Sequence, residues 1–143
     1  MCIRDRSYKY LEHSTDAFIE VKAKNLEEAF SVAGKSVVET IIDLKNIQEI
    51  EEKNIYVKGR NLLNLLYNWL EEIVTITITE GFAIGNFTVN IKKNGGYEIV
   101  SKISGEKLDL KKHNFKVEIK SPTFHLMEIK ENDEITMRYL LDL

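Results

Sequence analysis

The spacing of apolar residues along the chain predicts two helices set among several strands. Residues 17–23 alternate between apolar and polar side chains, which is typical of a half-buried strand. Residues 25–42 follow the spacing of an amphipathic helix instead, and Asn25 and Glu28 have the spacing of a capping box at its start. Residues 61–74 repeat the helical spacing with a wider apolar face. We therefore expect a second, well-buried helix there.

Two segments next to the second helix differ in how clearly they can be interpreted. Residues 47–59 favour an extended conformation, with Ile55 and Val57 as the clearest inward side chains. Residues 75–80, Thr-Ile-Thr-Ile-Thr-Glu, fit a strand by propensity, because their residues are β-branched and alternate. By position they continue a helix that meets no stop signal before Gly81. We expect the helix to extend to about Thr77.

The rest of the chain is expected to form strands joined by hairpins. Asn94-Gly95-Gly96 separates two apolar runs and is a strong hairpin signal, because the Asn-Gly pair tolerates positive φ. Residues 115–121 alternate cleanly and predict a further strand that Pro122 ends. Residues 131–133 predict a second hairpin before the C-terminal strand. The order of elements predicts a single α+β domain, with two helices packed on a mostly antiparallel β-sheet.

Composition agrees with one domain and excludes several classes of protein. The chain has 143 residues, of which 43% are hydrophobic and 30% charged, with a formal net charge of -3. This charge does not favour strong binding to nucleic acid. No apolar run approaches the roughly 18 residues that span a membrane, and no secretory signal is visible. The one cysteine, Cys2, cannot form an internal disulfide, which fits a reducing compartment.

The first six residues, Met-Cys-Ile-Arg-Asp-Arg, do not continue into the strand pattern that follows. They resemble a translated sequencing adapter, so we expect residues 1–6 to be a non-native extension and residues 7–143 to be the domain. An ordinary flexible N-terminus is the alternative.

The best candidate for chemistry is a set of oxygen ligands drawn from both ends of the chain. Phosphate-loop, dinucleotide-binding, paired-cysteine and Gly-x-Ser-x-Gly signatures are absent from the sequence. Asp16 ends a polar stretch, and Asp142 stands beside the terminal carboxylate of Leu143. Such carboxylates repel one another unless a hard cation such as Ca²⁺ neutralises them. Spacing alone favours the simpler interpretation, in which Asp16 caps a turn and Asp142 is a solvated chain end.

Six segments in one order resemble the archease family, small proteins that assist the GTP-dependent RNA-splicing ligase RtcB. The similarity extends from about Tyr8 to Leu143. The matching segments are Glu12-His13-Ser14-Thr15-Asp16, Leu26 to Phe30, Trp69 to Phe82, Gly105-Glu106 with His113, Ile119 to Met127, and Leu141-Asp142-Leu143.

The resemblance implies that Asp16, Asp142 and Leu143 bind a divalent cation, calcium in this family. His13 and Thr15 would then orient Asp16. His125 has two open interpretations, as an ordinary histidine of the sheet or as part of the acidic site.

The resemblance also implies an activator, not an enzyme. The ligase attaches guanylate from GTP to its own histidine, and archeases promote this guanylylation and multiple turnover in tRNA splicing. We expect RtcB as the partner, with weak or no direct nucleic-acid binding and no membrane association. One alternative is a chaperone-like modulator of tRNA-modifying enzymes such as a tRNA methyltransferase. Another is a metal-dependent hydrolase in which Asp16 and Asp142 hold a catalytic cation.

Overall fold

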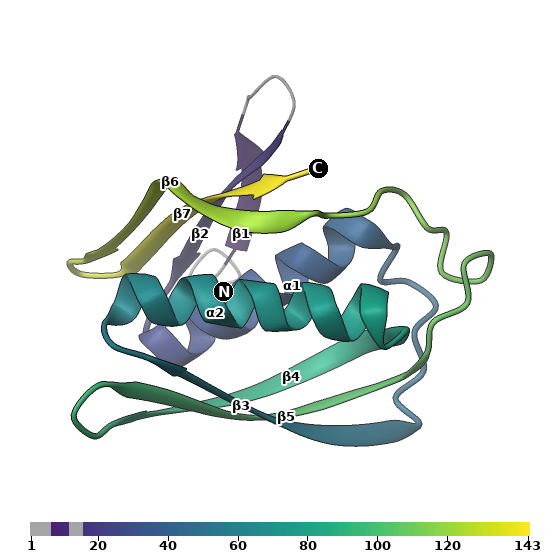
Figure 1. Cartoon of the computed structure of the whole chain (residues 1–143), viewed down its shortest axis with the longest axis horizontal. Helices are drawn as coiled ribbons and strands as arrows, with labels where there is room; N and C mark the ends of the chain where they lie inside the picture. Colours follow the sequence, from purple (N-terminus) through teal and green to yellow (C-terminus); the bar gives the residue numbers. More distant parts are fainter. Residues whose placement is uncertain (1–6, 12–15) are drawn as a thin grey trace.

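The structure is a computed structural model that describes residues 7–11 and 16–143. Seven strands, two α-helices and one π-helical turn make up this part of the chain (Figure 1). In chain order they are β1 (Ser7–Leu11), β2 (Asp16–Ala23), α1 (Leu26–Ile41), β3 (Glu51–Gly59), α2 (Leu62–Val74), η2 (Thr75–Thr79), β4 (Phe82–Lys93), β5 (Tyr97–Lys107), β6 (Ser121–Glu131) and β7 (Ile135–Asp142).

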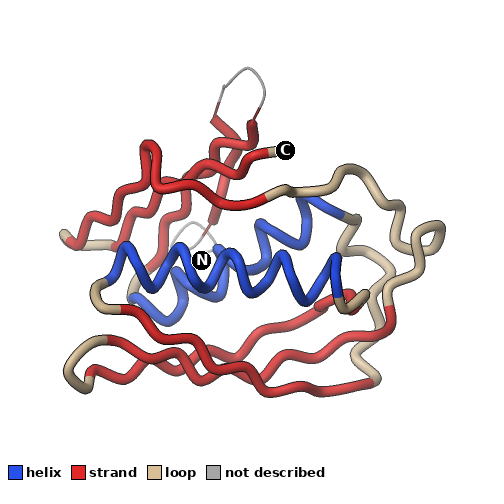
Figure 2. The backbone as a smooth tube through the Cα atoms, viewed as in Figure 1, coloured by secondary structure: helices blue, strands red, loops and turns tan. Residues whose placement is uncertain are grey.

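The strands form two antiparallel sheets with the helices between them. One sheet has the order β1-β2-β7-β6 and the other β3-β5-β4. Helix α1 packs on β2 and β4, and α2 packs on β3 and β6, so each helix touches both sheets. Figure 2 shows the two helices between the sheets. The predicted α+β class is confirmed, although the strands divide into two sheets where the sequence suggested one.

Each helix begins with the same pair of reciprocal hydrogen bonds. The Asn25 side chain accepts a hydrogen bond from Glu28 N–H, and Glu28 Oε1 accepts one from Lys24 N–H. In α2 the Asn61 side chain accepts a hydrogen bond from Asn64 N–H, and the Asn64 side chain accepts one from Arg60 N–H. The bonds to Asn25 and Asn61 satisfy backbone N–H groups that a helix start leaves without intrahelical partners. The predicted cap at Asn25 is therefore confirmed.

Helix α2 is the central element of the core. Its fully buried side chains include Leu65, Leu66 and Trp69, as the wide apolar face predicted. Trp69 Nε1 donates a hydrogen bond to the carbonyl oxygen of Phe30, 2.8 Å away, and so joins α2 to α1. The helix continues past Val74 as a π-helical turn, residues 75–79, that ends with Glu80 N–H bonded to the Thr75 carbonyl. The helical interpretation of this segment is confirmed, and it extends two residues beyond the expected end at Thr77.

The predicted strand at residues 115–121 is wrong. Residues 115–120 contain no strand, and Phe115 is exposed while Ile119 is buried. The backbone N–H of Lys116 bonds to the Ile41 carbonyl at the end of α1, and the backbone N–H of Lys120 bonds to the Asp142 carbonyl at the end of β7. The segment is therefore held at its two ends by different elements and forms no ladder with one strand. Strand β6 starts only at Ser121 and contains Pro122. Proline has no N–H to donate to a ladder, and β6 is an edge strand, where proline is tolerated.

Both predicted hairpins are confirmed. Residues 94–96 join β4 to β5, and residues 132–134 join β6 to β7. The expectation that residues 1–6 are a non-native extension lies outside the described residues and stays a prediction. Among the described residues, no helix has both the length and the apolar character needed to cross a membrane.

Candidate metal site at the end of the four-stranded sheet

Two aspartates from opposite ends of the chain face each other where β2 begins and β7 ends. Asp16 is the first residue of β2 and Asp142 is the last residue of β7, and the strand register pairs them directly. Directly opposed residues of an antiparallel pair point to the same face of a sheet, with Cβ atoms about 4.5–5.5 Å apart. The register therefore brings the two carboxylates together, and Ser121 of β6 is paired with Asp142 on its other side.

The alternation of both strands sets the direction of these side chains. Alternate residues of β2, starting at Ala17, are buried against the helices, as are alternate residues of β7 ending at Leu141. Asp16 and Asp142 belong to the other alternation, and Asp142 is exposed. The side chain of Leu143 packs partly against the core, which holds the chain end beside Asp142.

Two cavities meet at Asp16. One, of about 380 Å³, is lined by Asp16 and Leu143 together with residues from β1 and the end of α1, among them Tyr10, Glu39 and Thr40. The other, of about 570 Å³, is lined by Asp16, Asp142 and the first part of β6. Asp16 therefore contributes to both cavities, with the chain end on one side and Asp142 on the other.

The donor set at this place fits a hard cation. Asp16, Asp142 and the terminal carboxylate of Leu143 offer only oxygen ligands, which Ca²⁺ and Mg²⁺ prefer. Residues 7–11 and 16–143 contain no group of three or more His, Cys, Asp or Glu side chains that could hold a metal ion. A third ligand here would have to be an oxygen of another kind, and the main-chain carboxylate at Leu143 is the one that the resemblance implies.

The other candidate residues divide between the described and undescribed parts of the chain. His125 is an exposed residue of β6 that lines the larger cavity together with Asp16 and Asp142. Its backbone N–H bonds to the Thr123 hydroxyl. His13 and Thr15 lie outside the described residues. Their predicted roles in orienting Asp16 stay predictions, as does the role of His125.

A bulge in β6 borders the larger cavity and was missed by the sequence analysis. The pairing of β6 with β7 shifts between Thr123 and Glu128, and Leu126 adopts φ 63°. This left-handed conformation costs a leucine roughly 1–2 kcal/mol. Phe124 stacks on Tyr67 of α2, with ring centroids 4.4 Å apart and planes 10° apart. A signal was present in the sequence, because residues 124–127, Phe-His-Leu-Met, do not alternate between apolar and polar.

A second group of polar residues serves the fold. Glu106, near the end of β5, accepts hydrogen bonds from Lys112 Nζ at 2.9 Å and from the backbone N–H of Gln48 at 3.1 Å. His113 is fully buried, with Nε2 2.8 Å from Glu106 Oε2. Its Nδ1 accepts a hydrogen bond from Asp109 N–H, so Nε2 carries the proton that Glu106 accepts.

These contacts hold the pKa of Glu106 well below its ordinary value, at about 2. The bond from Lys112 is the largest cause, followed by those from His113 and Gln48. The three partners come from two different segments, residues 108–114 and residues 42–50, which Glu106 thereby joins to β5. Glu106 and His113 of the sequence motif therefore stabilise the fold. We call Glu106 with its partners Lys112, His113 and Gln48 the Glu106 cluster.

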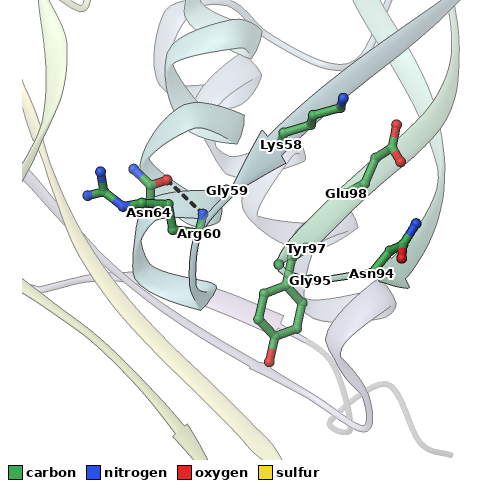
Figure 3. A pocket seen from close by; sticks show the side chains of 9 residues that line it. Lys58, Gly59, Arg60, Asn64, Asn94, Gly95, Tyr97 and Glu98 are labelled. Carbon is green, nitrogen blue, oxygen red and sulfur yellow. Dashed lines mark hydrogen bonds between the residues drawn. The ribbon is translucent and has the colours of Figure 1, made fainter.

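A further hollow, of about 410 Å³, lies beside the turn at Asn94 to Gly96 (Figure 3). Asn64 accepts a hydrogen bond from the Arg60 backbone N–H at its edge. The side chains of Arg60 and Lys58 point away from each other in this view, so they do not converge on a common ligand. None of the predicted site residues lines this hollow.

Fold and site together define a small α+β protein that places residues 142 and 143 beside the start of its second strand. Residues 8–143 match the model of the archease protein family (MTH1598/TM1083). Protein archease of Pyrococcus abyssi is 35% identical over 127 residues, covering 88% of this chain and 89% of that protein. Protein archease of Pyrobaculum islandicum is 33% identical over 145 residues, covering 99% of each.

A solved structure has the same fold. The solution structure of Methanobacterium thermoautotrophicum protein 1598 superposes with a TM-score of 0.78 at 28% sequence identity, covering 95% of this chain and 98% of that one. The chain therefore belongs to the archease family, and the resemblance seen in its sequence motifs is confirmed.

Proposed function

We propose that this protein activates the GTP-dependent RNA-splicing ligase RtcB in the cytoplasm, by promoting guanylylation of the ligase and its multiple turnover in tRNA splicing. It is a protein cofactor and joins no RNA itself. Membership of the archease family supports the partner. The pairing of Asp16 with Asp142 at the chain end is the observation that carries the proposal, because it supplies the oxygen ligands that such a role needs.

In this proposal the opposed carboxylates of Asp16 and Asp142 and the terminal carboxylate of Leu143 hold a divalent cation, calcium in the first instance. A bound cation neutralises the repulsion between the acids and fixes their geometry. The packing of the Leu143 side chain against the core keeps the terminal carboxylate in place. The protein then presents an ordered set of acidic oxygens to the metal-containing active site of the ligase.

The charge of the protein supports the division of labour between the two partners. Neutralising RNA phosphates needs clustered Lys and Arg, whereas this chain has a formal net charge of -3. We therefore propose that the ligase holds the tRNA and that this protein acts on the ligase. Weak, salt-insensitive tRNA binding by the isolated protein is expected in a filter-binding assay. Tight binding that falls steeply with salt would contradict this division.

The direct test is ligation under multiple-turnover conditions by the cognate ligase with GTP. Wild-type protein should raise both guanylylation and turnover. Asp16→Asn, Asp142→Asn and a short C-terminal extension after Leu143 should each reduce activation at least about tenfold, the scale on which loss of a metal-site group acts. Asp133→Asn is the matched control, because Asp133 is an exposed aspartate in the β6–β7 turn.

Two results would count against the proposal. Equal activation by wild type and all three site variants would remove the acidic site from the function. No activation of the ligase by wild type, together with stimulation of a tRNA methyltransferase, would favour the chaperone-like alternative.

A further inference from the structure

The bulge of β6, residues 124–127, places two apolar side chains, Phe124 and Leu126, at the surface, while Met127 packs partly against the core. It lies on an edge strand, between the pairs Thr123–Leu140 and Glu128–Arg138. Two of its large apolar side chains are exposed, Phe124 by 53% and Leu126 by 47%. Exposed apolar residues are common when scattered, but two of them on one bulge form a local apolar surface.

Leu126 adopts a backbone conformation that is unfavourable for leucine. Its φ of 63° lies in the left-handed region, where glycine or asparagine is tolerated and a leucine is strained. The exposed side chain recovers only part of this cost through burial. A glycine would allow the same bulge at lower cost, so the fold alone gives no reason for leucine at this position.

The aromatic ring of Phe124 is held in place before any partner arrives. It stacks on Tyr67 of α2, a well-buried helix, with ring centroids 4.4 Å apart. Phe124 nevertheless stays 53% exposed. An aromatic side chain that is fixed in advance loses little conformational entropy on binding, which is the property of an interface anchor.

The bulge is continuous with the acidic site. Phe124 and His125 line the same cavity of about 570 Å³ as Asp16 and Asp142. A partner that reaches the two carboxylates therefore also meets the bulge. Such a partner needs a cationic or metal-containing centre to match the acids, with apolar groups at its rim to match Phe124 and Leu126.

We propose that the β6 bulge is the apolar part of the docking surface for the ligase, with the ligase active-site rim as its occupant. This inference rests on the proposed function. Phe124 and Leu126 provide contact area beside the carboxylates, while Asp16 and Asp142 act on the ligase centre. Docking and activation are then separate tasks of neighbouring residues.

The test measures ligase binding, ligase activation, calcium affinity and melting temperature for each variant. Leu126→Gly should raise the concentration needed for half-maximal activation about tenfold, the scale of an interface anchor. Its melting temperature should stay unchanged or rise, because glycine relieves the strained φ. Phe124→Ala should weaken binding similarly. Calcium affinity should be unchanged in both variants.

Tyr56→Ala is the matched control, because Tyr56 is 65% exposed on β3 in the other sheet. Asp142→Asn should do the opposite of the two bulge variants, because it should largely keep ligase binding and lose activation. Normal half-maximal concentrations for Leu126→Gly and Phe124→Ala, with wild type active, would overturn the docking proposal alone. A wild-type dimer that Leu126→Gly dissociates in sedimentation would also overturn it, because a second copy would then cover the bulge. Wild type that neither binds nor activates the ligase would overturn the proposed function as well.

Discussion

Glu106 and Asp142 are acidic residues near strand ends, and their surroundings differ. Glu106 accepts hydrogen bonds from Lys112, His113 and the Gln48 backbone, and its side chain is nearly buried. Asp142 is exposed and faces a second carboxylate, Asp16, across the strand pair. Within the described residues, the Asp142 side chain has no hydrogen-bond or ion-pair partner.

The difference separates an acid that stabilises the fold from an acid that the fold positions. The carboxylate of Glu106 accepts hydrogen bonds from two other segments and so joins them to β5. The charge of Asp142 adds repulsion to its strand pair, because like charges directly opposite are destabilising in a sheet. Removing charge should therefore destabilise the protein at Glu106 and stabilise it at Asp142 when no cation is present.

The largest effect on stability is expected beside Glu106, where the backbone leaves no room for change. A Cβ atom on Gly105 would lie 1.9 Å from the Ala83 carbonyl oxygen in β4. A backbone atom cannot move aside as a side chain can, so Gly105→Ala should lower the free energy of unfolding by about 3 kcal/mol or more. Urea denaturation measures this change. A loss below about 1 kcal/mol would show that the β4–β5 pairing is looser than the structure indicates.

A pH dependence should follow from Glu106. Its pKa is about 2 in the folded protein against an ordinary value of 4.5. An acid whose pKa is lowered by folding stabilises the protein above its ordinary pKa, and this stabilisation is lost as pH falls through the folded value. The free energy of unfolding should therefore decrease as the pH falls from about 4.5 to about 2.

Glu106→Gln isolates this contribution. The variant should be less stable than wild type above pH 4.5, and the difference should shrink as pH falls toward 2. Urea denaturation at several pH values measures both quantities. Asp133→Asn, in an exposed turn, is the control. If the difference in stability between Glu106→Gln and wild type is the same at every pH, the charge of Glu106 does not stabilise the folded protein.

A smaller effect of opposite sign is expected at Asp142. In the presence of a chelator, Asp142→Asn should raise the free energy of unfolding by roughly 0.2–1 kcal/mol, because it removes one of two directly opposed charges. Excess calcium should abolish or reverse this advantage, since only the wild type then gains the stabilisation of a bound ion. Thermal unfolding with chelator and with calcium measures both terms. Lower stability of the variant in chelator would contradict repulsion between Asp16 and Asp142.

The sequence predicted correctly those elements that depend on residues close to one another in the chain. The cap at Asn25, the turn at residues 94–96 and the buried face of α2 all depend on neighbours in the sequence, and all three are present. Residues 115–121 have an equally clear strand pattern, yet residues 115–120 form no strand, and the Lys116 N–H bonds to the end of α1 instead. The division of the strands into two sheets likewise depends on long-range pairing, which alternation does not encode.

The candidate site could be predicted only in part for the same reason. The residues alone offered Asp16, Asp142 and the Leu143 carboxylate as a possible oxygen cluster, but spacing favoured an ordinary turn at Asp16. The resemblance to archeases implied that all three bind a cation. The structure supplies the register that opposes Asp16 to Asp142, a pairing between the two ends of the chain. Cation binding by these residues stays a prediction. The bulge at Leu126 arises from a three-residue shift of β6 against β7, and the break in alternation at residues 124–127 does not give the size of that shift.

Calorimetric titration with Ca²⁺ tests the central claim most directly, using wild type, Asp16→Asn, Asp142→Asn and Asp133→Asn. The account predicts that wild type and Asp133→Asn bind one ion per chain with equal affinity. It predicts that both site variants bind at least about tenfold more weakly while keeping the circular-dichroism spectrum of the folded protein. Equal calcium affinity in all four proteins, or no binding by wild type, would contradict a cation site formed by the opposed aspartates and the chain end.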